Sequence, residues 1–279
     1  AGSSGKGIMR ALLINPRYLS VFLVVVVSFC MASFVDPAIL SDGDVFLHVA
    51  AGLWILQHHA VPHVDSFSHS FSGAPWVAHE WLSEVLAALA YGWAGWGGVL
   101  VLAALAYASA MGSMAVFVVQ RMESMLAIWL VYVCSFTMTL PCLLARPHIL
   151  ALPCFVLWSI CLFRAREKGT APPPWPTVLI LLVWTNLHGS FAIGLALLVP
   201  FAFEAFLAEK QRRFRVLAAW ARFAVLSAIA VSITPNGWRG LLFPVQLVMM
   251  PQMATIKEWT PMQMRLTEPA LLVFCALIY

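Results

Sequence analysis

Long apolar runs separated by short polar loops dominate the chain. Residues 18–35, 96–119, 125–144, 148–163 and 216–233 are almost wholly apolar, and each approaches or exceeds the roughly 18 residues that cross a bilayer core about 30 Å thick. Such runs are typical of membrane-spanning helices rather than of soluble helices, which alternate apolar and polar faces. The pattern predicts an all-α, polytopic integral membrane protein.

Residues 177–207 form one apolar run that is too long for a single ordinary crossing. Basic loops flank it on both sides, so the chain is expected to cross and return, turning at the polar sequence TNLHGS, residues 185–190. A proline-interrupted stretch, residues 241–251, and a last apolar segment follow. With these additions we expect about seven or eight transmembrane helices.

Basic residues are distributed unequally between the two sets of loops, which predicts the orientation in the membrane. One set carries Lys6, Arg10, Arg17, Arg121, Arg164, Arg166, Lys168, Lys210, Arg212, Arg213 and Arg215, whereas the other carries Arg146, Arg239, Lys257 and Arg265. Because basic loops stay in the cytoplasm, the N-terminus is predicted to be cytoplasmic. The polar motifs ARPH, NLHGS, TPNG and KEW then share the outer face with the loop 36–95, which predicts a common cavity.

The two ends of the chain carry separate expectations. Residues 1–17 are interpreted as a tag-like, cytoplasmic N-terminus, and 18–279 as a single transmembrane domain that contains the outer loop 36–95. The closing sequence stops inside an apolar run without a polar cap. We therefore expect the natural chain to continue past Tyr279.

Composition excludes several function classes. Hydrophobic residues make up 62% and charged residues 10% of the chain, against roughly a quarter charged in soluble domains. The net charge of +4 lies in short loops, so no nucleic-acid partner is predicted. The six cysteines fall inside apolar runs without CxxC spacing, which argues against a disulfide framework or a structural zinc site.

The outer loop 36–95 is the polar exception, since it holds six of the eight histidines and half of the twelve acids. Ionisable groups gathered beside a bilayer indicate a functional site. Apolar residues recur at helical spacing after Asp44 and again after Trp76, which predicts two helices lying in the membrane surface. On these helices Asp44 and His48 share one face, and Glu80 and Glu84 share another.

The sequence SDGDVFLHVAAG, residues 41–52, carries a resemblance to a known family. It places Asp42 shortly after the first span with the aromatic Phe46 four residues on, and Asp44 adds a second acid. This arrangement, with two surface helices before the second span, resembles the GT-C glycosyltransferases, which include protein O-mannosyltransferases and the aminoarabinose transferases that modify lipid A. The chain departs from many relatives in having DGD in place of Asp-Glu, so the catalytic acid stays ambiguous.

The resemblance implies transfer of a sugar from a polyprenyl-phosphate-linked donor to an acceptor on the periplasmic or lumenal face. Asp42 or Asp44 would act as general base for an acceptor hydroxyl. Positive charge and hydrogen-bond donors would stabilise the leaving phosphate. The candidate substrate-binding residues are His48, His79, Glu80, Arg146, His148, Asn186, His188, Lys257 and Glu258, with Arg239 as a further possibility. Some family members use a divalent cation, for which Asp42, Asp44 and His48 are the candidate ligands.

Each of these residues also has a purely structural interpretation. Asp42 and Asp44 suit helix N-capping, and His48 suits pairing with Asp44. His79 and Glu80 fit a polar helix start. Arg146 could simply extend its side chain from the end of a span towards water. Asn186 and His188 suit the turn of a short hairpin.

Other functions are weighed against sugar transfer. HEWLSE begins like the zinc-protease motif, but Ser83 occupies the position of the second histidine. A membrane transporter is the main alternative, although an internal repeat is not evident and the acids lie outside the spans. A non-catalytic assembly subunit of a cell-envelope complex is the third. The basic, short-loop pattern favours a bacterial inner membrane, with the endoplasmic reticulum as the alternative.

Overall fold

A computed structural model describes residues 15–35, 37–40, 42–140 and 143–250, and over these ranges the protein is all-α, as predicted. Its helices are α2 (Pro16–Cys30), α3 (Gly43–His58), α4 (Trp81–Val119), α5 (Met125–Thr139), α6 (Pro147–Lys168), α7 (Val178–Leu187), α8 (Phe191–Ala208), α9 (Arg213–Val231) and α10 (Trp238–Val248). A π-helical turn, Met31–Val35, extends α2, and short 3-10 turns lie at Pro37–Leu40 and Trp175–Thr177.

Five helices in the described part of the chain are long and apolar enough to cross a membrane, which supports an integral membrane protein. They are Pro16–Ser33, α4, α6, α8 and α9. The prediction of seven or eight spans counted α5 and α7 as well, and both are shorter. With ten residues at 1.5 Å each, α7 extends over about 15 Å, half of a bilayer core. The last predicted segment lies outside the described residues.

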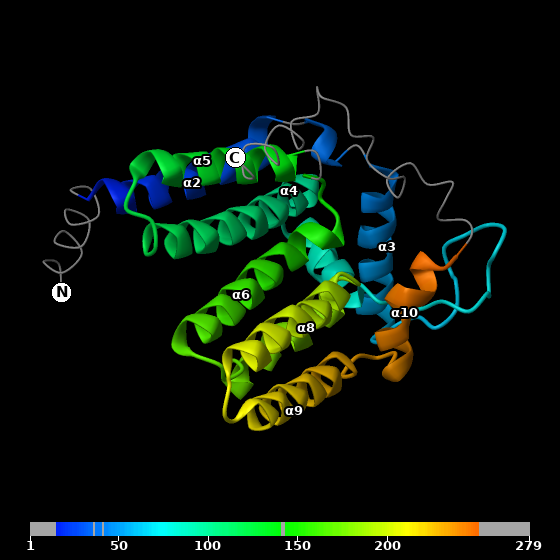
Figure 1. Cartoon of the computed structure of the whole chain (residues 1–279). Coiled ribbons are helices and arrows are strands. Elements are labelled where there is room, and N and C mark those ends of the chain that lie inside the picture. Colours follow the sequence, from blue (N-terminus) through cyan, green and yellow to red (C-terminus); the bar gives the residue numbers. More distant parts are fainter. Residues whose placement is uncertain (1–14, 36, 41, 141–142, 251–279) are drawn as a thin grey trace, which may run out of the picture.

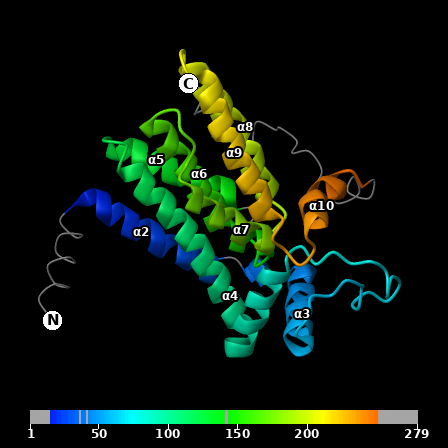
Figure 2. The same ribbon diagram turned by 90° about the horizontal axis from the view of Figure 1, so that it is seen from below.

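The long helices lie next to one another, and α3 and α10 lie across one end of this bundle (Figures 1 and 2). Two apolar cores hold the bundle together. Tyr107 and Tyr132 are buried in the first, between α2, α4, α5 and α6. Trp158 and Trp184 are buried in the second, between α6, α7, α8 and α9. The predicted return of the chain at residues 185–190 is confirmed by the α7–α8 hairpin.

Helix α4 joins the second predicted surface helix to the second predicted span. Its backbone leaves helical geometry at Ala94 and Gly95, where Gly95 has a φ of 59° that favours glycine. The break coincides with the predicted start of the span at Trp96. The surface helix was predicted to start near Trp76 but starts at Trp81, with Glu80 as the residue before its first turn.

Helix α3 packs closely against the first part of α4. A Cβ atom at Gly52 would lie 1.9 Å from the backbone oxygen of Glu84, so only glycine permits this crossing. Val45 and Val49 are buried in the contact, whereas Phe46 and Ala50 of the predicted apolar face are exposed. The side chain of Asp42 accepts a hydrogen bond from the Asp44 backbone N–H, 3.0 Å away, and caps the helix.

Candidate functional site

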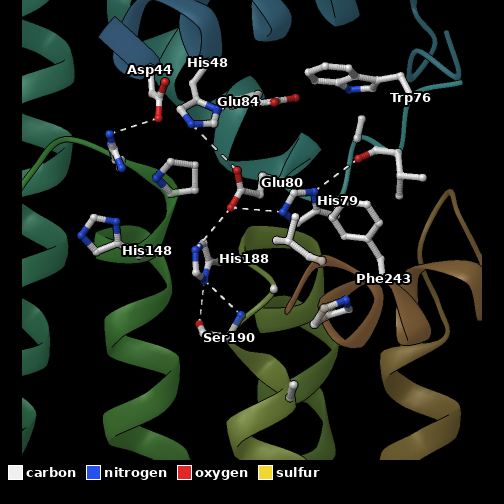
Figure 3. A pocket seen from close by; sticks show the side chains of 18 of the residues that line it. Asp44, His48, Trp76, His79, Glu80, Glu84, His148, His188, Ser190 and Phe243 are labelled. Carbon is white, nitrogen blue, oxygen red and sulfur yellow. Dashed lines mark hydrogen bonds and ion pairs between the residues drawn. The ribbon is translucent and has the colours of Figure 1, made fainter. Parts of the chain in front are cut away.

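A cavity of about 920 Å³ lies at the end of the bundle that α3 and α10 cover. Five chain segments line it: residues 44–48, 75–84, 146–148, 188–193 and 243–249. The outer loop, the ARPH motif and the NLHGS turn, widely separated in sequence, therefore meet at one place. Figure 3 shows the charged and imidazole side chains of this cavity facing one another.

Arg146 joins both aspartates of the DGD motif. Its Nη2 binds Asp42 Oδ2 and lies 3.0 Å from Asp44 Oδ2. Because Pro147 follows Arg146, the arginine backbone is extended, and the side chain sits at the start of α6 beside the cavity. The Asp42 side chain is 15% exposed and the Asp44 side chain 58%, and of the two only Asp44 lines the cavity. Asp44 is therefore the carboxylate of this pair that a substrate can reach.

Glu80 is surrounded by three histidines (Figure 3). Its Oε1 lies 3.5 Å from His79 Nε2 and 3.3 Å from His188 Nε2, and its Oε2 lies 3.9 Å from His48 Nε2. Burial raises the pKa of the Glu80 carboxyl. The hydrogen bond and charge of His79 and the charges of His188 and His48 outweigh this effect and lower the pKa to about 2. Glu80 is thus an ionised carboxylate at neutral pH.

Hydrogen-bond partners assign a different protonation state to the two histidines on Glu80 Oε1. The Nδ1 of His79 faces the Val77 carbonyl at 3.3 Å and its Nε2 faces Glu80, so both nitrogens face acceptors. This arrangement suits an imidazolium ion. Burial lowers the pKa of His79, but the hydrogen bond and charge of Glu80 outweigh it and leave the pKa raised.

His188 has the opposite surroundings. Its Nδ1 accepts from the Ser190 backbone N–H at 3.0 Å and lies 2.8 Å from Ser190 Oγ, which accepts in turn from Trp184 Nε1 at 2.9 Å. The proton of neutral His188 is therefore on Nε2, directed at Glu80. Burial lowers the pKa of His188, and repulsion from His148, His79 and His48 lowers it as well. The charge of Glu80 raises the pKa but only partly offsets these effects, and the pKa is about 4.

Glu84 and Trp76 are site residues that the sequence analysis missed. The Glu84 side chain is 5% exposed, and its Oε1 lies 3.5 Å from His48 Nδ1. Its Oε2 and the indole Nε1 of Trp76 are buried and have no hydrogen-bond partner among the described residues, although both side chains line the cavity. The available signal was the spacing of Glu80 and Glu84, which places them on the same helical face.

Asn186 was predicted to bind substrate, but it does not line the cavity. Its Oδ1 accepts from Trp81 Nε1 at 2.7 Å, and its Nδ2 donates to the carbonyls of Leu182 at 2.8 Å and Ile233 at 3.1 Å. The amide therefore ties α4 and α7 to the segment that follows α9. Asn186 is a structural residue, because neighbouring groups already use both ends of its side chain.

The predicted cation site is not formed by Asp42, Asp44 and His48. The two aspartates contact Arg146, whereas His48 faces Glu80 and Glu84. Within the described ranges, no three His, Cys, Asp or Glu side chains are grouped so that they would hold a metal ion.

The remaining predicted residues fall into three positions. His148 lines the cavity, with its ring centroid 6.1 Å from that of His188. Arg239 lies beside Trp238 in a smaller adjoining hollow of about 450 Å³. Lys257 and Glu258 lie outside the described residues.

Apolar side chains complete the wall of the large cavity opposite the charged groups. Ile193 of α8 and Phe243, Val245 and Leu247 of α10 all line it. The ring of Phe243 lies 4.5 Å from that of His79, so the apolar and charged walls are continuous. A cavity of this kind fits an amphiphile, with a polar head at Arg146 and the histidines and a greasy chain along α8 and α10.

No family model matches the chain, and searches of curated proteins and of solved structures found no match. A functional conclusion for this protein therefore depends on the chemistry of the cavity.

Proposed function

We propose that this protein is a membrane glycosyltransferase of the GT-C type. It moves a sugar from a polyprenyl-phosphate-linked donor to an acceptor on the outer face of a bacterial inner membrane. One observation carries the proposal: a single cavity at the end of apolar helices combines an accessible carboxylate, an arginine and an apolar wall. The proposal includes a cytoplasmic N-terminus and seven or eight crossings, of which α5 and the segment Trp175–Leu187, the 3-10 turn together with α7, would supply two.

Asp44 serves as the general base in this proposal. An acceptor hydroxyl is a weak nucleophile, and a carboxylate within hydrogen-bond reach takes its proton as the oxygen attacks the anomeric carbon. The bond from that carbon to the donor phosphate breaks, and the polyprenyl phosphate leaves with the electron pair. Asp44 is suited to this role because it lines the cavity and is exposed, whereas Asp42 caps α3 and is covered.

Arg146 and His148 bind the leaving phosphate. Both lie at the N-terminal end of α6, where backbone N–H groups and the helix dipole also favour an anion. A guanidinium grips phosphate oxygens in two places, which stabilises the negative charge as the glycosidic bond breaks. The aspartates on Arg146 hold its side chain in position before the donor arrives.

The prenyl chain lies along the apolar wall. Val245 of α10 and Ile193 of α8 are exposed as well as lining the cavity, so a chain bound there leads to the outer surface of the bundle. This surface carries other exposed apolar side chains, including Val199 and Phe203, as expected for contact with lipid. A membrane-embedded donor would therefore enter from the side without leaving the bilayer.

The test is sugar transfer by the purified protein in proteoliposomes. Radiolabelled glycosyl phosphates of short polyprenols are offered with candidate acceptors, and labelled product is measured. Asp44→Asn is expected to lower the rate by about 10²- to 10⁴-fold, the usual contribution of a general base. Glu204→Gln makes the same chemical change at an exposed ion pair with Arg166 and should leave the rate unchanged. Full activity of Asp44→Asn rejects the base assignment, and movement of labelled lipid across the bilayer without transfer favours a transporter.

A further inference from the structure

We infer that the part of the cavity formed by Glu84, Trp76 and His48 is a subsite for an uncharged, polyhydroxylated sugar ring. The inference rests on the proposed function and specifies its donor: the transferred sugar carries hydroxyl groups and no carboxylate or phosphate of its own.

The hydrogen-bonding capacity left open in the cavity carries this inference. Buried polar groups in proteins almost always have partners, so each exception requires an explanation. Here Glu84 Oε2, an acceptor, and Trp76 Nε1, a donor, are both buried and lack a partner among the described residues. A hydroxyl group both donates and accepts through one oxygen, so a ring bearing several hydroxyls satisfies both kinds of atom. An aromatic face such as that of Trp76 also packs well against the C–H groups of a sugar.

Charge restricts the kind of sugar. The Glu84 side chain is only 5% exposed, and Glu80, whose Oε2 faces His48, is 13% exposed. Because the His79 imidazolium already faces Glu80, Glu84 is the carboxylate that a further anion would meet. Two carboxylates repel each other strongly in a poorly solvated region, where the interaction is weakly screened. A uronic acid or a phosphorylated sugar would place its charge against Glu84. A neutral ring only exchanges water hydrogen bonds for hydrogen bonds to charged acceptors, which are the stronger kind.

The position of the subsite is compatible with transfer. His48 follows Asp44 by one turn of α3, so the Cβ atoms of the two residues lie about 5–6 Å apart. A ring that contacts His48 and Glu84 thus brings its anomeric carbon within reach of an acceptor hydroxyl held by Asp44. Phosphate would lie at Arg146, which also contacts Asp44. The sugar and phosphate parts of the donor therefore match two adjoining parts of one cavity with opposite charge.

Equilibrium binding in detergent tests the subsite without requiring catalysis. The probes are farnesyl phosphate, farnesyl phosphoryl hexose and farnesyl phosphoryl hexuronate. The hexose ligand should bind about tenfold more tightly than farnesyl phosphate, as expected for one or more hydrogen bonds to a charged group, and the hexuronate should bind no more tightly than farnesyl phosphate.

Glu84→Gln should lessen the preference for hexose over hexuronate by about tenfold, because it removes the charge and keeps the shape. Trp76→Phe should reduce hexose binding while leaving farnesyl phosphate binding unchanged, which separates loss of the subsite from misfolding. Equal affinity for all three probes overturns the subsite, as does a preference for hexuronate. If the protein prefers hexose over hexuronate but never transfers sugar, the subsite is supported and the transferase proposal is rejected.

Discussion

At the scale of single residues, the neighbours of a side chain decide its role more than its chemical type does. Arg146 precedes α6 and Asn186 lies in the last turn of α7, both within polar motifs, and the sequence predicted substrate binding for both. In the structure Arg146 reaches the cavity, because the proline after it keeps its backbone extended. Asn186 instead bonds to Trp81 and to the Ile233 carbonyl, just after α9. Sequence spacing identifies polar residues near a site. It does not say which of them bond to other protein groups and which remain available to a ligand.

Asn186→Ala tests the structural role of this amide. The substitution leaves the Trp81 N–H and the Ile233 carbonyl without partners, which is expected to lower the free energy of unfolding by about 2–4 kcal/mol. Affinity for a farnesyl phosphate ligand should stay within about twofold of the original, since Asn186 does not line the cavity. Thermal unfolding in detergent and ligand titration measure the two effects. Loss of ligand affinity without loss of stability would return Asn186 to the binding site.

Protonation of His188 should destabilise the protein in mild acid. The folded-state pKa is lowered to about 4 from 6.5, so the neutral form is favoured on folding, and the stability it provides is present above pH 6.5 and lost towards pH 4. At pH 5 the contribution of His188 to the free energy of unfolding is about 2 kcal/mol smaller than at pH 7.5. His79 acts in the opposite sense, because its raised pKa adds stability as the pH falls. The pKa of Glu80 is lowered from 4.5 to about 2, so most of its own contribution is lost only below pH 4.5.

Thermal unfolding of the protein and of His188→Gln at the two pH values isolates this contribution. Between pH 7.5 and pH 5 the variant should lose about 2 kcal/mol less than the protein. His148, His79 and His48 also act on His188 and remain in the variant, so they serve as the background. An unchanged pH dependence in His188→Gln would show that another group carries it.

At the scale of elements, hydropathy predicted the long helices well and their exact ends less well. The runs 125–144 and 177–207 were predicted to span, yet α5 and α7 are short, because proline and polar residues end the helical hydrogen bonding earlier than hydropathy falls. The close crossing of α3 and α4 was also not predictable from a single sequence. Gly52 lies within an apolar stretch without any local sign that its missing side chain admits another helix.

Gly52→Ala tests how far this crossing holds the site together. The added Cβ would lie 1.9 Å from the Glu84 backbone oxygen, so α3 must move away from α4. We expect a loss of about 2–4 kcal/mol in the free energy of unfolding and weaker ligand binding, because His48 and Glu84 separate. Gly43→Ala is the matched control in the same helix, since nothing lies within 4 Å of a Cβ there. Equal stability of the two variants would contradict the close packing.

At the scale of the whole molecule, the charges of the loops predicted that the outer loop, ARPH, NLHGS, TPNG and KEW would share one cavity. TPNG lines the smaller adjoining hollow instead, and KEW lies outside the described residues. The outer loop, residues 146–148 and the turn at residues 188–190 line one cavity, although residue numbers alone give no reason for their proximity. Hydropathy and charge do not predict the side-chain geometry inside that cavity. Glu80 emerges as its centre only when His79, His188 and His48 are seen around it.

The opposite end of the bundle carries the exposed ion pairs Arg121–Glu167 and Arg166–Glu204, in loops and helix ends rich in basic residues. If basic loops remain cytoplasmic, the cavity faces away from the cytosol.

In a variant whose own cysteines are replaced by alanine, His63→Cys, in the smaller hollow that adjoins the cavity, should react with a membrane-impermeant maleimide applied to intact cells or spheroplasts. Lys168→Cys at the other end should react only after the membrane is permeabilised. Both positions are exposed, so accessibility differs through sidedness alone. Labelling of Lys168→Cys from outside, with His63→Cys protected, would invert the topology and remove the cavity from the compartment where outer-face acceptors occur.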